Sequence, residues 1–296
     1  MNYRHIYHAG GFSDVFKHTI LIALIQSLLK KETPFCYIDT HAGIGNYDLH
    51  LESAQKTQEF QYGISKLQGI TDHDIPDSIA TYLNIIQTWN HRMRQDSRLY
   101  SSDLKELDIL RYYPGSPVFA RELLRDKDHI ILAELHPEDA QTLKQLFKQD
   151  KQVATHFLDG YTAFKAFLPP KEKRGLVLID PPFEKTDEFE TLIQKLTLGI
   201  HRWRNGIYAI WYPLKNPRQV NHFYKNLSQI GASEILCYEL YMPQQQRSNH
   251  GMHACGMAIL QPPWGFKETL ERVLPWLCQK LGEGVKWREF LHMSRK

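Results

Sequence analysis

The tetrapeptide Asp180-Pro181-Pro182-Phe183 combines a carboxylate, fixed backbone carbonyls and an aromatic ring. It follows the apolar run 175–179, and an apolar run that ends in an acid is typical of a strand buried on both faces of a parallel sheet. Two prolines prevent a helix from starting and keep the next carbonyls extended. The oxygens can accept N–H bonds while the ring stacks, so this turn suits a planar ring with an exocyclic amine. The same residues also fit a turn that only caps a strand.

Three other predicted strands end in, or are followed by, an acid, namely Asp39, Glu134 and Asp159. In open α/β sheets, ligands bind beyond the carboxyl ends of the strands. Glu134 could accept both hydroxyls of a ribose, and Asp159 could accept from an adenine amine. Each acid taken alone could instead cap a helix. Four of them in order, with the glycine-containing loop 41–45 after the first, favour a nucleoside site.

Strands and helices alternate along most of the chain, which predicts an α/β, Rossmann-like fold with a mostly parallel sheet. A helix from Ser13 or Asp14 to about Lys31 comes first. The last two strands are joined without a helix, so they must pair antiparallel or leave the sheet. The seven expected strands cover 35–40, 130–134, 153–159, 175–180, 207–212, 234–241 and 254–260.

Residues 46–110 interrupt this alternation with two helical patterns, around 60–67 and 79–86, and no strand between them. We therefore expect a helical insertion on the sheet and a single domain over residues 1–296. Residues 1–13 are aromatic, rich in histidine and glycine-containing, which indicates an N-terminal loop.

The composition is ordinary for a globular protein, with 296 residues, 42% hydrophobic residues and a formal net charge of +3. This mild charge permits a nucleic-acid partner without requiring one. The four cysteines lack CxxC spacing, so they fit neither a zinc site nor a secreted disulfide framework. The N-terminus has no apolar signal core, and the longest apolar stretch, 20–25, is too short to cross a bilayer. We expect a cytoplasmic protein with no membrane partner.

The order of acid-ended strands resembles the class I S-adenosylmethionine-dependent methyltransferases, and Asp180-Pro181-Pro182-Phe183 resembles the Asp/Asn/Ser-Pro-Pro-aromatic motif of those that methylate amines. Further motifs resemble the bacterial 23S rRNA adenine-N6 methyltransferase J family, and they span essentially the whole chain. These motifs are Tyr3-Arg4-His5, His8-Ala9-Gly10, Asp14-Val15, Lys17-His18-Thr19, Asp39-Thr40-His41-Ala42-Gly43, Tyr112-Tyr113-Pro114-Gly115-Ser116-Pro117, Glu134-Leu135-His136-Pro137, Gly206-Ile207-Tyr208-Ala209, Trp211-Tyr212-Pro213, Gly256-Met257 and Pro262-Pro263-Trp264.

The resemblance implies S-adenosylmethionine as cofactor and N6-methylation of a specific adenine in 23S rRNA. Asp180 takes the catalytic role, and we expect the Pro181 carbonyl as a second acceptor and Phe183 as the stacking ring. Asp39 and Gly43 are expected beside the cofactor. The residues that the resemblance implies as lining the cofactor site are Lys17, His18, His41, Ser116, Glu134, Asp159, Gly160 and Asp180.

The resemblance also implies that the N-terminal segment around Tyr3 closes over the site when substrate or cofactor is present. We therefore expect Tyr3 and Arg4 to contact the substrate. Lys215, Arg218 and Arg247 lie in or beside loops at the carboxyl ends of strands, where they could hold phosphates or remain solvated surface charges.

The chain departs from the family pattern at Phe183, where tyrosine is usual, and this change keeps the stacking face. The insertion is longer around residues 91–108, which leaves RNA contacts there undefined. A metal cluster of histidines lacks recognised ligand spacing, and methyl transfer from a sulfonium needs no metal, so we expect no metal and a monomer. The histidines considered are His5, His8, His18 and His41.

Other functions stay open at this point. DNA adenine and protein glutamine methyltransferases also use an X-Pro-Pro-aromatic turn, although no separate DNA-recognition domain is visible. An RNA-binding or ribosome assembly factor could keep the fold without the activity, but Glu134 and Asp180 are both present. A dinucleotide-dependent oxidoreductase is disfavoured because the first turn lacks G-x-G-x-x-G.

Overall fold

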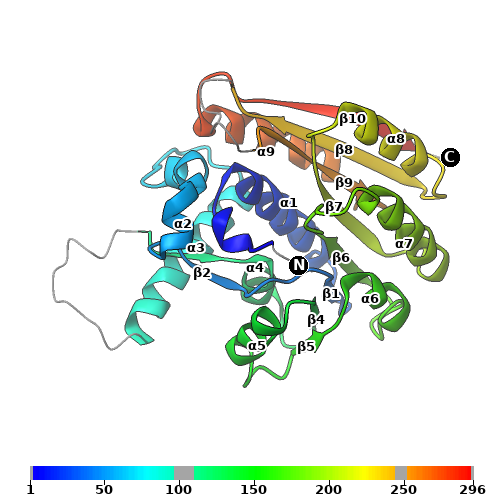
Figure 1. Cartoon of the computed structure of the whole chain (residues 1–296), viewed down its shortest axis with the longest axis horizontal. Coiled ribbons are helices and arrows are strands. Elements are labelled where there is room, and N and C mark those ends of the chain that lie inside the picture. Colours follow the sequence, from blue (N-terminus) through cyan, green and yellow to red (C-terminus); the bar gives the residue numbers. More distant parts are fainter. Residues whose placement is uncertain (1–2, 97–109, 244–251, 295–296) are drawn as a thin grey trace.

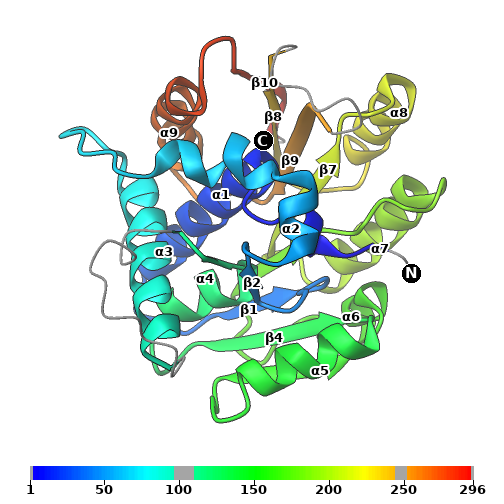
Figure 2. The same cartoon turned by 60° about the vertical axis from the view of Figure 1, so that its left-hand side comes forward.

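The computed structural model describes residues 3–96, 110–243 and 252–294, and its main feature is an eight-stranded sheet with helices on both faces (Figures 1 and 2). The strands are β1 (Cys36–Asp39), β4 (His129–Glu134), β5 (Val153–Phe157), β6 (Gly175–Ile179), β7 (Ile207–Pro213), β8 (Glu234–Tyr241), β9 (Ala254–Leu260) and β10 (Lys286–Ser294). Their order across the sheet is β10-β8-β9-β7-β6-β1-β4-β5.

The strands β5, β4, β1, β6 and β7 are parallel, and they bring their carboxyl ends to one edge. Strand β9 lies antiparallel between β7 and β8, which confirms the predicted hairpin. All seven predicted strands are present, and the α/β class is confirmed. The prediction of seven strands was one too few, because β10 pairs antiparallel with β8 at the edge of the sheet. Strand β10 carries several charged residues, as edge strands often do, so it lacks the apolar signal of a buried strand.

Two apolar cores lie on the two faces of the sheet. One contains side chains from α1 (Phe12–Leu29), α4 (Ser116–Leu123), α5 (Pro137–Leu146) and α9 (Phe266–Leu281). The other contains side chains from α6 (Gly160–Ala166), α7 (Glu188–Arg202) and α8 (Pro217–Leu227).

Helix α1 is buried along almost its whole length. By length and composition it could cross a membrane, but most of it lies inside the fold, as in the core helix of a globular domain. The predicted cap was wrong. Gly11 is the N-cap, and Ser13 and Asp14 are buried within the first turn. Asp14 still serves this end of the helix, because its Oδ2 accepts the N–H of Gly10 at 3.0 Å.

The insertion begins with a short strand, β2 (Asn46–Asp48), which pairs antiparallel with β3 (Tyr112–Pro114). Helix α2 (Glu52–Thr57) follows, and the helical pattern predicted around 60–67 forms two 3₁₀ turns, η2 (Glu59–Tyr62) and η3 (Ile64–Leu67), so that prediction was wrong in type. Helix α3 (Asp77–Asp96) packs against α1. The longer part of the insertion noted in the sequence falls mostly at 97–109, outside the described residues.

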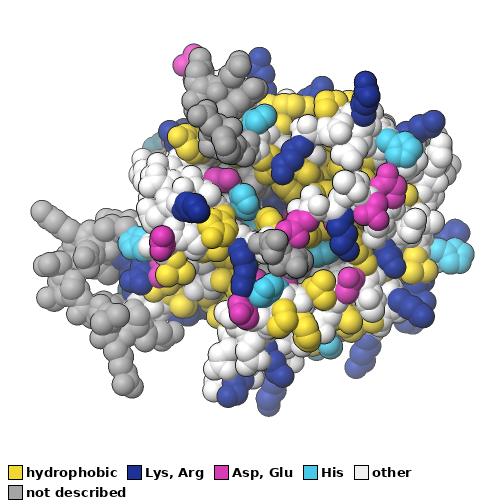
Figure 3. All heavy atoms as spheres, viewed as in Figure 1, with side chains coloured by type: hydrophobic (Ala, Val, Ile, Leu, Met, Phe, Trp, Pro, Cys, Tyr) yellow, Lys and Arg dark blue, Asp and Glu magenta, His cyan; other side chains and the backbone are white. Residues whose placement is uncertain are grey.

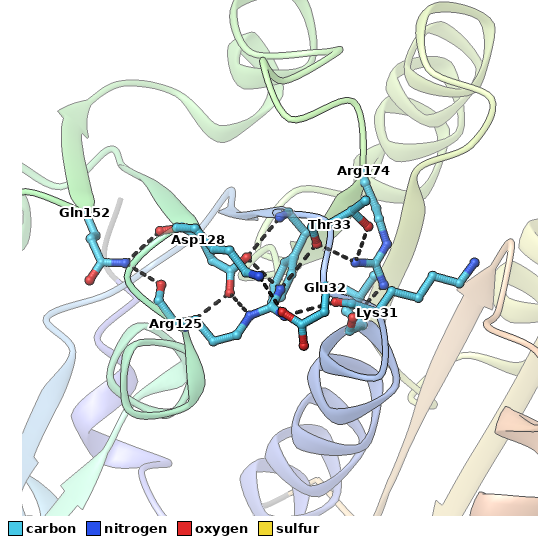
Figure 4. A network of polar contacts seen from close by, with 10 residues as sticks. Lys31, Glu32, Thr33, Arg125, Asp128, Gln152 and Arg174 are labelled. Atoms are coloured by element: carbon cyan, nitrogen blue, oxygen red, sulfur yellow. Dashed lines mark hydrogen bonds and ion pairs between the residues drawn. The ribbon is translucent and has the colours of Figure 1, made fainter.

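At the amino-end edge of the sheet, a polar network fixes the turn between α1 and β1 (Figure 4). The carboxylate of Asp128 is fully buried and accepts the Phe35 N–H at 3.0 Å and the Arg125 Nε–H at 2.8 Å. Arg125 also donates to the Lys31 carbonyl at 2.9 Å, and Arg174 donates to the Thr33 carbonyl at 2.9 Å. These bonds tie the carboxyl end of α1 to the segments that lead into β4 and β6.

Candidate active site

Two cavities meet at the carboxyl-end edge of the sheet. The first has a volume of about 360 Å³ and the second about 530 Å³. They share five wall residues, Tyr3, His5, Lys17, Asp180 and Pro182. The turn after β6 therefore faces both cavities, which is the position in which one carboxylate can serve two bound groups.

Glu134 ends β4 and forms part of the wall of the first cavity. Its Oε2 accepts the N–H of Gly43 at 2.8 Å, and its Oε1 accepts the N–H of His136 at 2.8 Å. Burial raises the pKa of this carboxyl. Gly43 has φ +63°, and a Cβ there would lie 2.3 Å from the Tyr47 hydroxyl, so the position requires glycine. The loop after β1 thus fixes a carboxylate with spare acceptor capacity in the cavity wall.

Asp159 caps α6 and also lines the first cavity. Its Oδ1 caps α6 by accepting the N–H groups of Tyr161 at 2.8 Å and Thr162 at 3.2 Å. Its Oδ2 has no hydrogen-bond partner among the residues described, and the side chain lines the first cavity. At Gly160, a Cβ would lie 2.8 Å from Cε1 of His41 and closer still to the Thr40 carbonyl, so glycine is needed for this close approach.

Asp39 does not line either cavity. It is completely buried behind the wall, where its Oδ2 accepts the hydroxyls of Tyr37 and Ser116, each at 2.7 Å. Its Oδ1 accepts the His41 N–H at 3.2 Å. Burial raises the pKa of Asp39 to about 6. Asp39 therefore positions Ser116 and His41, which do line the first cavity.

His18 and His41 line the same cavity as uncharged rings. Burial lowers the pKa of His41 to about 4 and holds the pKa of His18 well below its usual value. The Nδ1 of His41 lies 2.8 Å from the Thr40 hydroxyl, and the Nδ1 of His18 lies 2.8 Å from the Tyr113 hydroxyl. Both imidazoles thus contribute flat, partly apolar walls.

Lys17 carries the positive charge between the cavities. Its Nζ lies 2.5 Å from Oδ2 of Asp180 and 2.9 Å from Oδ1 of Asp14. Burial disfavours this charge, but the two carboxylates outweigh burial and raise the pKa of the Lys17 ammonium well above its usual value. Burial also opposes the charge of Asp14, yet His5 and Lys17 hold the pKa of that carboxyl well below its usual value. The ammonium stays charged and holds one oxygen of Asp180.

The second cavity has aromatic and apolar walls next to Asp180. Pro181, Phe183 and Trp211 all line it. The Phe183 ring centroid lies 4.8 Å from that of Phe189 and 6.0 Å from that of Trp211. Phe183 has φ 49°, a left-handed conformation that is uncommon for a bulky side chain and often occurs at functional sites.

The N-terminal segment lies across both cavities. The Tyr3 hydroxyl is 2.9 Å from Nδ1 of His5, and the Tyr3 ring stacks on His8 with the centroids 5.6 Å apart. Arg4 is not part of either cavity wall. Its guanidinium is bonded to Glu138 and Asp139, each at 2.5 Å, at the start of α5.

The four histidines considered as a metal cluster have separate partners. The Nε2 of His5 lies 2.9 Å from Asp14 and the Nδ1 of His8 lies 3.0 Å from Glu59, while His18 and His41 face hydroxyls. Over residues 3–96, 110–243 and 252–294, no group of three or more His, Cys, Asp or Glu side chains is arranged to hold a metal ion.

Apart from Asp39, the residues predicted for the cofactor line the first cavity, and Asp180, Pro181, Phe183, Tyr3 and Lys215 line the second. Arg218 lies outside both walls, and Arg247 is outside the described residues. Sequence reasoning missed wall residues that come from separate elements and carry no shared spacing. Among them are His5, Tyr47, Leu135, Asp139, Tyr161, Glu184, Lys185 and Glu188 in the first cavity, and Lys56, Thr57, Glu59 and Trp211 in the second.

Several known proteins are similar to this chain in sequence or in structure. Residues 32–290 match the family model described as "Ribosomal RNA large subunit methyltransferase D, RlmJ". The chain is 39% identical over 282 residues to the ribosomal RNA large subunit methyltransferase J of Escherichia coli, covering 95% of this chain and 94% of the relative. The Haemophilus influenzae protein of the same name is 38% identical over 281 residues, with the same coverage. A crystal structure of a Legionella pneumophila protein is similar with a TM-score of 0.82 and 31% identity, covering 96% of this chain and 98% of that one.

Proposed function

Since the chain belongs to the ribosomal RNA large subunit methyltransferase J family, we propose that it transfers the methyl group of S-adenosylmethionine to N6 of a specific adenine in 23S rRNA. The observation that carries this proposal is the meeting of two cavities at Asp180. One cavity has the acids expected for a nucleoside cofactor, and the other has the aromatic wall expected for a base. A transferase needs its donor and its acceptor on two sides of one reacting position.

The first cavity has the donor set that S-adenosylmethionine requires. Glu134 offers acceptor positions for the ribose hydroxyls, and Oδ2 of Asp159 offers an acceptor for the adenine amine. The lack of a side chain at Gly160 lets the start of α6 pack closely on Thr40 and His41, which fixes the loop after β1 at the cavity wall. When bound, this cofactor supplies an electrophilic methyl group on a sulfonium. The protein supplies binding and orientation.

Asp180 and the Pro181 carbonyl are the groups that act on the acceptor amine. The N6 lone pair is delocalised into the adenine ring, so this nitrogen is a poor nucleophile. Accepting both N6 hydrogens favours the tetrahedral nitrogen of the transition state, and Asp180 also offers an acceptor for the proton that N6 must lose. Because Lys17 holds Oδ2, the second oxygen of Asp180 is left for the substrate.

Phe183 provides the stacking surface for the target base in the second cavity. An adenine inside a duplex could not reach Asp180, so the base must be unpaired or flipped out of its stack. Alignment of nitrogen, methyl and sulfur by the two cavities contributes several kcal/mol to lowering the barrier.

The direct test is to map N6-methyladenine in 23S rRNA from cells with and without this gene. One adenine should lose its methyl group in the deletion strain and regain it when the gene is restored. Purified protein with labelled S-adenosylmethionine should then label 23S rRNA. If the label enters DNA or protein instead, the DNA adenine or protein glutamine alternative replaces this proposal. If no macromolecule is labelled, the assembly-factor alternative is favoured.

A further inference from the structure

The helical insertion contributes directly to the second cavity. Lys56 and Thr57, at the end of α2, line the same wall as Pro181 and Phe183. Figure 1 shows α2 on one side of the N-terminal turn and the end of β7 on the other. From the β7 side, Lys215 reaches the cavity. The mouth of the second cavity thus has a lysine from each of two distant parts of the chain.

These two lysines differ from the other charged groups of the cavity. Lys17 is paired with Asp14 and Asp180, and His8 is paired with Glu59. Lys56 and Lys215 are exposed, and neither ammonium has a partner within the described part of the chain. The three carboxylates of this wall lie beside Lys17, His5 and His8. The wall also has three lysines, so these charges balance in number, but the ammonium groups of Lys56 and Lys215 have no carboxylate of the described residues within ion-pair distance and remain open to an external anion.

Positive charge at the mouth of a base-sized, aromatic cavity suits one kind of ligand. A nucleotide within a strand carries a phosphate on each side of its sugar, while its base can enter a cavity. Lysines bind phosphates as point charges and are the usual source of affinity for a nucleic-acid backbone. Figure 3 shows basic, acidic and histidine side chains mixed around the N-terminal residues on this face, so the face as a whole is not uniformly basic.

We infer that Lys56 and Lys215 form a phosphate clamp, which holds the backbone on the two sides of the nucleotide whose base enters the second cavity. The clamp rests on the proposed function, and it names the substrate of that site as an unpaired or flipped-out nucleotide inside a polyanionic strand. It also gives the helical insertion a role, since α2 supplies one half of the clamp.

The test compares the double variant Lys56→Ala/Lys215→Ala with a matched double control, Lys171→Ala/Lys148→Ala. The control lysines are exposed and lie in loops at the amino-end edge of the sheet, away from both cavities. Their substitution removes the same number of positive charges as the double variant does. Two quantities are measured for each protein: methylation of transcribed 23S rRNA, and filter binding of the same labelled RNA over a range of salt concentrations.

The clamp predicts that KM for rRNA rises about tenfold or more in the double variant, with kcat within about twofold of wild type. The slope of log K against log salt should become shallower by about 1.4, because each lost contact to single-stranded RNA removes about 0.7. The control should match wild type in both measurements. The clamp is wrong if the double variant also matches wild type, or if both double variants change equally. Failure of the proposed function is a distinct result, in which wild-type protein itself does not methylate rRNA.

Discussion

Lys17 and Asp180 form a buried ion pair, with 2.5 Å between Nζ and Oδ2, on the wall that separates the two cavities. The pair joins the first turns of α1 to the turn after β6. It orients a carboxylate whose other oxygen faces the substrate in the proposed reaction.

Asp180→Asn tests the catalytic role directly. The amide can still accept with its oxygen, but its NH₂ group would face either the Lys17 ammonium or the N6 hydrogens, so one acceptor is lost. We expect kcat to fall about 100-fold or more, as when one group that stabilises a transition state is removed. The Kd for S-adenosylmethionine, measured by calorimetry, should change little. A variant that methylates rRNA at nearly the wild-type rate would rule out this assignment.

Phe183 can be tested with a pair of substitutions. Phe183→Ala removes the ring and should raise KM for rRNA by about 5- to 150-fold, since stacking on a base is worth ~1–3 kcal/mol. Phe183→Tyr keeps the stacking face and serves as the control, with KM close to wild type. Equal KM values for the alanine and tyrosine variants would argue against stacking at this position.

Glu134→Gln tests the first cavity. Both oxygens of Glu134 accept backbone N–H groups, so an amide must turn its own NH₂ toward either Gly43 or His136. The lost bond and the weaker acceptor should raise the Kd for S-adenosylmethionine about tenfold, and kcat at saturating cofactor should stay near wild type. Glu283→Gln, an exposed carboxyl in the turn after α9, is the control and should not change the Kd. An unchanged Kd for the Glu134 variant would remove this residue from the cofactor site.

Asp39 should make the free energy of unfolding depend on pH. Its folded-state pKa of about 6 lies above the unfolded value near 4, so the folded protein binds the proton more tightly. Stability from this group is therefore present at low pH and lost as pH rises through about 6, by roughly 3 kcal/mol in total. Asp14 has a lowered pKa, so its contribution to stability has the opposite sign: it is present at neutral pH and is lost only at more acid pH.

The measurement is urea unfolding of wild type and Asp39→Asn at pH 7 and pH 4.5. The difference between the two proteins should shift in favour of wild type at the lower pH, because the variant has no proton to bind at this position. A difference that stays constant between the two pH values would show that Asp39 does not titrate in this range.

The site residues that could be predicted are those that end a strand or directly follow one in the sequence. A buried parallel strand is a run of apolar residues, and an acid directly after it marks the ligand edge, so Glu134 and Asp180 could be found from local pattern alone. Asp39 follows the same pattern, but a local pattern cannot tell whether a carboxylate faces the cavity or the interior. Its contacts with Tyr37 and Ser116 turn it inward.

The rest of the site depends on the three-dimensional fold. Tyr161, Glu188 and Trp211 lie on separate elements, and nothing in their spacing shows that they line cavities. The local sequence also does not identify Lys17 and His18 as site residues. They lie in an apolar helix, where a buried polar side chain is usually part of the core. Only the family resemblance placed them at the site. Strand β10, which pairs with β8 at the edge of the sheet, was missed because its charged residues leave no apolar signal of a buried strand.

Helix α1 is 18 residues long, which makes it a strut of about 27 Å. Contacts near its two ends hold it at opposite edges of the sheet. In the second turn, Lys17 pairs with Asp180. After the last turn, Arg125 and Arg174 of the network around Asp128 donate to the carbonyls of Lys31 and Thr33. A helix transmits a shift along its own axis from one end to the other. Asp128→Ala removes the centre of the network at the far end of the helix. We therefore expect this substitution, although distant from both cavities, to displace the Lys17 ammonium and to slow methyl transfer.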